Sequence, residues 1–502
     1  MKRTLALLFG LLASAAIGAT GYGRAHFTSF TQTRHFVSRC LRPYSRAGER
    51  ALSFTGLLHE FRIVMSRIWL LIRSGKLRVS PMETVTSTSG SLETRTFSAA
   101  SLATASSGLG RVESIDILRG IVMVIMALDH TRDFFTNLSY EPELLAKTYY
   151  GLFFARWITH FCAPLFFFLA GTGAFFYGRR HTSAELTRFL WTRGLWLILL
   201  EFTVVGTSWT FLFPWGFFGV IWALGGCMVV LALGVRLPVR WLALLSLLVI
   251  ATHDLFDRVR PQQFGSFAWV WGVLHVRGGI TLPFQLHEFV LFPLIPLVGV
   301  MAAGYCFGTL YLLEERHRKK RLKRAGIALV VTFCLLRFTN LYGNPSVAVG
   351  GVSQGDWHVQ STFEKTLVLF LDVEKYPMSL QFLLMTLGPA LLFLAWLDKN
   401  DNPQKTSALR HALLIFGRVP LFYYVLHLYL IHGLAILLAV LFRQPVTWLF
   451  HGAIFGDTPA GYGHGLLFIY LVWITAIVIL YFPCRWWAGL KQRRKAWWLS
   501  YL

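Results

Sequence analysis

Asp129, His130 and Asp133 are a histidine and two carboxylates close together in a stretch that is otherwise apolar. On a helix, Asp133 stands three residues after His130, so its carboxylate can accept the proton of one imidazole nitrogen. The other nitrogen is then free to act as a base. The simpler alternative is a core histidine bonded to a carbonyl. We predict that His130 is catalytic and that Asp133 or Asp129 orients it.

A polar stripe extends along the same predicted helix. Asp116, Arg119, His130 and Phe134 fall within about 60° of one direction at 100° per residue, and Arg119 lies about 16 Å from His130 along the axis. This stripe is expected to face protein or water instead of lipid. For Asp116 and Arg119, an ion pair at a helix start is an equally good explanation.

Other apolar stretches also carry polar groups, which we expect at one depth in the membrane. An ionisable residue at the centre of a membrane helix costs about 2.5–3.5 kcal/mol on insertion scales. One convergent site explains several of them more simply than unrelated buried charges. Gly171 and Gly173 would admit a slim ligand, although close helix packing is the commoner reason for such glycines. The candidate substrate-binding residues are Arg156, His160, Glu201, His287, Arg337 and His427.

The motifs narrow the chemistry. His427 and His432 are five residues apart and do not share a helix face, so no metal site is predicted. The sequence has no P-loop and no GxGxxG before a helix. A histidine base with a nearby carboxylate and several arginines suits transfer of an acyl group from an anionic donor to a hydroxyl or an amine.

Composition and hydropathy indicate the elements that position these residues. The chain has 502 residues, of which 55% are apolar and 14% are charged, as in a polytopic membrane protein. We predict an all-α transmembrane bundle of about ten spans. They lie near 115–135, 152–178, 187–212, 216–235, 239–256, 288–312, 325–342, 377–397, 411–440 and 463–486.

The net charge of +24 comes from basic clusters between these stretches. The clusters follow alternate spans, which places them and the C-terminal tail, 491–502, in the cytoplasm and the polar groups at the outer side of a bacterial-type inner membrane. Basic residues interleaved with exposed aromatics are missing from the sequence, so nucleic acid is not expected as a partner.

The first 110 residues do not fit this scheme and form a separate predicted segment. Residues 1–20 are typical of a signal peptide. Two explanations are open: 1–81 is a basic extension, or translation begins at Met82, which we favour. Residues 82–110 are rich in Ser, Thr and Ala and predict a disordered cytoplasmic tail.

Residues 111–120 (RVESIDILRG) and 126–130 (MALDH) resemble the opening helix of the membrane acyltransferase superfamily, and more closely the bacterial relatives of heparan-α-glucosaminide N-acetyltransferase. Three further segments add to the similarity, which covers 111 to about 490. They are 161–171 (FCAPLFFFLAG), 375–388 (KYPMSL and LMTLG) and 416–427 (FGRVPLFYYVLH).

The resemblance implies a helical bundle that takes an acetyl group from cytoplasmic acetyl-CoA and delivers it to a sugar on the far side. It maps the superfamily's essential histidine to His130 and its Asp-x-x-Arg-Gly motif to 116–120. We expect Asp116, Arg119, Gly171 and Gly173 on the side of the CoA donor. The lipid bilayer, acyl-CoA and a carbohydrate acceptor are the expected partners, and an oligomer is compatible with the sequence. The alternative is a transporter or flippase of an anionic or glycan substrate, although inverted repeats are not evident in the sequence.

Overall fold

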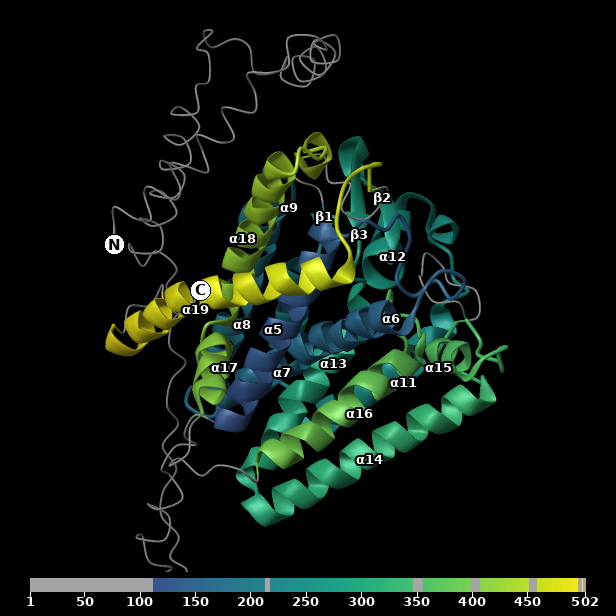
Figure 1. Cartoon of the computed structure of the whole chain (residues 1–502). Helices are drawn as coiled ribbons and strands as arrows, with labels where there is room; N and C mark the ends of the chain where they lie inside the picture. The colour runs from purple at the N-terminus through teal and green to yellow at the C-terminus, as the bar shows by residue number, and fades with distance from the viewer. Residues whose placement is uncertain are drawn as a thin grey trace, which may run out of the picture. The chain divides into compact units, whose positions relative to one another are not determined.

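The computed structural model describes residues 112–212, 217–345, 355–398, 407–450, 458–494 and 499. Within these ranges the chain is mostly helical, with one small sheet (Figure 1). The predictions made for residues 1–110, including the signal peptide and the start at Met82, lie outside the described residues.

Long helices form where apolar runs predict them. In chain order they are α5 (Glu113–Phe135), α7 (Cys162–Gly178), α8 (Ser183–Leu200), α10 (Val220–Gly234), α11 (Val239–Thr252), α13 (Leu294–Phe307), α14 (Glu315–Thr339), α16 (Leu380–Leu397), α17 (Ala408–Arg418), α18 (Pro420–Leu441) and α19 (Leu466–Arg493). Shorter helices are α6 (Tyr150–Trp157), α9 (Gly206–Thr210), α12 (Ala268–His275) and α15 (Phe363–Leu371).

Polar residues set several helix starts. The Thr182 side chain and Glu185 form a reciprocal capping box before α8. Ser379 accepts a hydrogen bond from the backbone N–H of Phe382 at the start of α16. Pro420 occupies the first turn of α18, where its missing N–H costs no helical hydrogen bond.

Seven helices in the described residues are long and apolar enough to cross a membrane. They are Tyr150–Gly178, Ser183–Thr210, Val239–Phe256, Leu294–Leu312, Leu380–Leu397, Pro420–Leu441 and Leu466–Arg493. The predicted count of about ten is not confirmed. The other three predicted spans correspond to α5, which is interrupted by charges, to α10, which has 15 residues, and to α14, which begins with a basic run.

Three short strands depart from a purely helical fold. β1 (Phe217–Phe218), β2 (Gly278–Leu282) and β3 (Leu286–Val290) form a sheet in the order β1-β3-β2. β1 is parallel to β3, and β2 is antiparallel to β3 with Gly278 opposite Val290. The segments that form this sheet fall in and beside predicted loops, where hydropathy gave no sign of strands.

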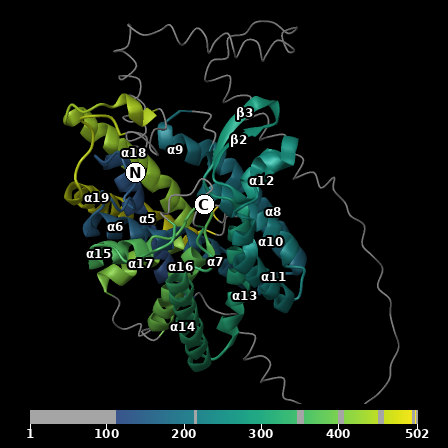
Figure 2. The ribbon, with the colours of Figure 1, turned by 90° about the vertical axis from the view of Figure 1, so that its right-hand side faces the viewer.

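Helix α5 lies among several others and contacts α7, α17, α18 and α19 (Figures 1 and 2). Small residues permit the closest of these contacts. A Cβ added to Gly120 would lie 2.0 Å from the Leu413 carbonyl oxygen in α17, and one added to Gly417 would lie 1.9 Å from that of Asp116. The two backbones therefore touch where glycine replaces a side chain.

Charged contacts fix the N-terminal end of α5. Glu113 pairs with Arg410 at 2.9 Å. Asp398, at the end of α16, accepts a hydrogen bond from Ser114 at 3.0 Å and pairs with Arg318 of α14 at 2.6 Å. This end of α5 lies beside the basic segments that we predict to be cytoplasmic, whereas residues 129–135 lie at the opposite end of the helix.

Candidate functional site

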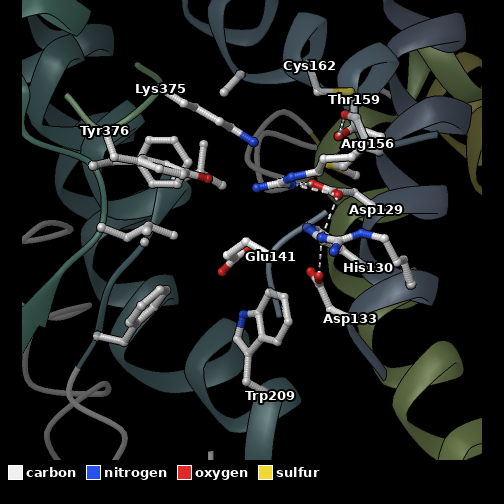
Figure 3. A pocket seen from close by; sticks show the side chains of 18 of the residues that line it. Asp129, His130, Asp133, Glu141, Arg156, Thr159, Cys162, Trp209, Lys375 and Tyr376 are labelled. Atoms are coloured by element: carbon white, nitrogen blue, oxygen red, sulfur yellow. Dashed lines mark hydrogen bonds and ion pairs between the residues drawn. The ribbon is translucent and has the colours of Figure 1, made fainter. Parts of the chain in front are cut away.

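A cavity of about 290 Å³ lies beside the C-terminal part of α5. Its lining includes side chains of α5, α6 and α18, of the loop after α5 and of the segment before α16. In Figure 3, Asp129, His130 and Asp133 lie on one wall, and Lys375 and Tyr376 lie on the other. The volume is at the small end of the range for ligand pockets, roughly 300–1,000 Å³, and suits a monosaccharide-sized group.

His130 makes its side-chain hydrogen bond to a second histidine. Nδ1 of His427 lies 3.1 Å from the carbonyl oxygen of Tyr423, which can only accept, so this nitrogen carries a proton. In the neutral ring, Nε2 of His427 then holds a lone pair, and it lies 2.7 Å from Nδ1 of His130. The network therefore assigns the proton of His130 to Nδ1, which donates to His427. Nε2 of His130 is left as the basic nitrogen, with no hydrogen bond to any described residue.

The carboxylates beside His130 pair with arginines. Nη1 of Arg156 lies 2.7 Å from both oxygens of Asp129, and Nη2 of Arg132 lies 3.1 Å from Asp129 and 2.6 Å from Asp133. The prediction that Asp133 or Asp129 accepts the His130 proton is therefore wrong in this geometry. Both carboxylates are engaged by guanidinium groups, and His427 takes their expected place.

Glu143 does not line the cavity but holds Arg156 in place. Its Oε1 accepts hydrogen bonds from Nε of Arg156 at 2.9 Å and from Nε2 of His160 at 3.3 Å. Burial acts to raise the pKa of Glu143, but the Arg156 guanidinium and the His160 hydrogen bond outweigh it and hold this pKa well below its usual range. His160, a predicted substrate residue, thus lies behind the cavity and acts on it through Glu143 and Arg156.

Glu201 lines the cavity as predicted, and it also caps a neighbouring helix. Its Oε2 accepts the backbone N–H of Trp222 at 2.8 Å, in the first turn of α10. Gly219 makes room for the carboxylate, since a Cβ there would lie 2.6 Å from Oε1. A π-helical turn, Glu201–Val205, carries the residue, and such turns occur often at functional sites.

Asp116 and Arg119 do not line this cavity. They form the i,i+3 ion pair at 3.4 Å, and Arg119 also donates to the Gly417 carbonyl of α17. Between Arg119 and His130 the stripe is filled, because Met123 and Ala127 are buried in the core. The pantetheine arm of acetyl-CoA, if it followed this stripe from Arg119 to His130, would have to displace packed side chains.

The two glycines predicted to bind the CoA donor, Gly171 and Gly173, have different surroundings in the structure. A Cβ on Gly171 would lie 1.9 Å from the Met301 carbonyl oxygen in α13, so this glycine serves close helix packing. A Cβ on Gly173 would meet nothing within 4 Å. Neither residue lines the cavity.

Arg337 and His287 also lie away from the cavity. Arg337 is fully buried and donates to four backbone carbonyl oxygens, those of Leu369, Phe370 and Asp372 at the end of α15 and that of Gly355 in the loop before it. Its role as a substrate ligand is therefore wrong in this structure, because backbone carbonyls hold all three of its nitrogens. His287 is exposed on β3 and bonds to Thr281 at 3.1 Å.

Sequence reasoning missed Lys375, Tyr376 and Glu143. Lys375 is 4% exposed and still reaches the cavity. Its signal was a lysine at the outer end of an apolar run, on the side where basic residues are uncommon. Glu143 gave no such signal, because it belongs to a polar loop.

Residues 111–339 match the family model described as heparan-alpha-glucosaminide N-acetyltransferase, catalytic. A search of curated proteins found no match to the chain. The matched region contains His130, Asp129 and Arg156 and ends before Lys375 and His427. Residues 111–339 are therefore similar to the catalytic region of heparan-alpha-glucosaminide N-acetyltransferase.

Proposed function

We propose that this protein is a membrane acyltransferase that moves an acetyl group from acetyl-CoA to a hydroxyl or an amine of a carbohydrate. The observation that carries the proposal is the basic Nε2 of His130 beside a charged, sugar-sized cavity. The family match supports the reaction class. Within the described residues no group of His, Cys, Asp and Glu is arranged to hold a metal ion, and the proposed step uses none.

The proposed reaction uses His130 as the base. The acceptor oxygen or nitrogen attacks the thioester carbonyl carbon while Nε2 of His130 takes its proton. The C–S bond then breaks, and the CoA thiolate receives that proton from the imidazolium. Arg156 is our candidate for stabilising the oxyanion, because Nε and Nη1 are fixed by Glu143 and Asp129.

We also propose that transfer takes place on the extracytoplasmic side. The cavity is at the end of α5 opposite the contacts of Arg318 and Arg410, which belong to basic segments. The positive-inside rule assigns such segments to the cytoplasm. Acetyl-CoA would then donate across the bundle, and its entry path is a separate question for experiment.

The test is acetyl-CoA-dependent transfer by the purified full chain in detergent. The acceptors are glucosamine, glucose and glucuronate, and free CoA is measured by chromatography. His130→Ala should lower turnover by about 100-fold or more, the usual contribution of a general base. His432→Ala is the matched control, because His432 is a buried histidine of α18 that does not line the cavity. Full turnover by His130→Ala would refute the mechanism, and substrate movement in proteoliposomes without CoA release would favour a transporter.

A further inference from the structure

Lys375 is the one buried lysine among the described residues, and it is 4% exposed at the cavity wall. Its ammonium group has no carboxylate of the described residues within ion-pair distance, and Nζ lies 5.1 Å from the ring centroid of Tyr376. A cation–π contact leaves the full positive charge in place. A buried charge without a counter-ion is unfavourable, so such residues are usually kept for a ligand.

The other cations of the cavity are already held. Arg132 pairs with Asp129 and Asp133, and Arg156 pairs with Asp129 and Glu143. Arg277 lies over the rings of Phe289 and Tyr376, at 5.8 Å and 5.2 Å from their centroids. Lys375 thus differs from them, and in Figure 3 its nitrogen points across the cavity towards Arg156. The ammonium group of Lys375 is therefore available to an anionic group of a ligand that enters the cavity.

We infer that Lys375 binds the carboxylate of an acidic sugar and so selects uronate-type acceptors. This inference rests on the proposed acyltransferase function. A hexuronic ring carries its carboxylate on C5, and its C2 and C3 hydroxyl groups lie across the ring from it. A carboxylate at Lys375 therefore directs a hydroxyl to the opposite wall, where His130 lies (Figure 3).

Stabilisation of the thioester oxyanion is the competing role for Lys375. The negative charge develops on the carbonyl oxygen of the carbon that the acceptor attacks, so a stabilising group must lie near the base. Lys375 comes from the wall opposite His130 (Figure 3), and its charge also acts on the His130 imidazole. The variants below distinguish the two roles, because a role at the thioester affects every acceptor equally whereas a carboxylate site affects acidic acceptors alone.

The experiment measures binding of glucuronate to the purified full chain by titration calorimetry, with the neutral methyl ester of glucuronic acid as the matched ligand. Wild-type protein should bind glucuronate at least tenfold more tightly than the ester. Lys375→Met should remove this preference, and Lys375→Arg should keep most of it. Lys365→Met is the control, because it makes the same change at an exposed site in α15.

The outcomes separate this inference from the proposed function. Equal affinity of the wild type for glucuronate and the ester would overturn the inference without any variant, whatever the folding of Lys375→Met. A loss of acetyl-CoA cleavage by Lys375→Met that is equal for glucuronate and glucose would assign Lys375 to the thioester and would also overturn it. Wild-type transfer to neutral sugars alone would retain the proposed function and refute the uronate preference.

Discussion

The hydrogen bond from His130 to His427 gives the sharpest prediction. In His427→Leu, Nδ1–H of His130 loses its acceptor at 2.7 Å, and the tautomer with a basic Nε2 loses its support. Leaving a buried donor unsatisfied costs about 1–3 kcal/mol. At about 1.36 kcal/mol per tenfold change in rate, kcat should fall about 5- to 150-fold. KM for the acceptor should change little, because His427 itself does not line the cavity.

The conservative variant separates this role from simple packing. The amide oxygen of His427→Gln can accept the His130 proton, so its kcat should recover a large part of the loss. The assay is steady-state release of CoA by the purified chain, and thermal unfolding in detergent monitors integrity. His432→Leu is the control, since His432 lies on the same helix as His427 but bonds to the Ser208 carbonyl of α9. Equal kcat values for the Leu and Gln variants of His427, or an unchanged kcat in both, would refute the tautomer argument.

Two further predictions concern stability. Glu143→Gln should lower stability at pH 7 by about 3 kcal/mol, because it leaves a buried guanidinium short of a charge. The folded-state pKa of Glu143 lies below its unfolded value, so its contribution is present above about pH 4.5 and is lost as the pH falls. The gap between wild-type and variant unfolding midpoints should therefore stay nearly constant from pH 7 to about pH 4.5 and shrink as the pH falls further to about pH 3. A gap that stays constant below about pH 4.5 would contradict this linkage. Gly120→Ala should cost about 1–3 kcal/mol by overpacking, whereas Gly173→Ala, with nothing within 4 Å, should be close to neutral in the same unfolding assay.

Local patterns predicted the helices well, because the length of an apolar run and the capping residues at a helix start both depend on consecutive residues. The runs around α7 and α16 gave their spans within a few residues, whereas the predicted span 411–440 merged α17 with α18. Charge along a helix gave the polar face of α5 and its ion pair between Asp116 and Arg119. The number of membrane spans was harder to predict. Short or charged helices such as α10 and α14 are apolar over only part of the length that a membrane span needs.

Partnership between distant residues could not be predicted. Asp133 is the carboxylate nearest to His130 in sequence after Asp129, and helical spacing made it the obvious partner. Arg132, the sequence neighbour of Asp133, carries a full charge and pairs with this carboxylate, whereas the partner of His130 is His427, 297 residues later in the chain. Arg337 illustrates the same limit. A buried arginine in the sequence can either bind a ligand or donate to backbone carbonyl oxygens. Only the structure shows which, because it places the end of α15 beside Arg337 of α14.

The proposed site depends on both ends of the helical region. His130, Asp129 and Arg156 belong to the segment that matches the family model, whereas His427 and Lys375 follow it. The base is supplied by α5, but its tautomer is set from α18, 297 residues later in the chain. The proposed selectivity for an anionic acceptor is set from the segment before α16. Reaction and specificity would therefore respond to different parts of the sequence, so variants of Lys375 should change which acceptor is used and variants of His427 should change how fast every acceptor reacts.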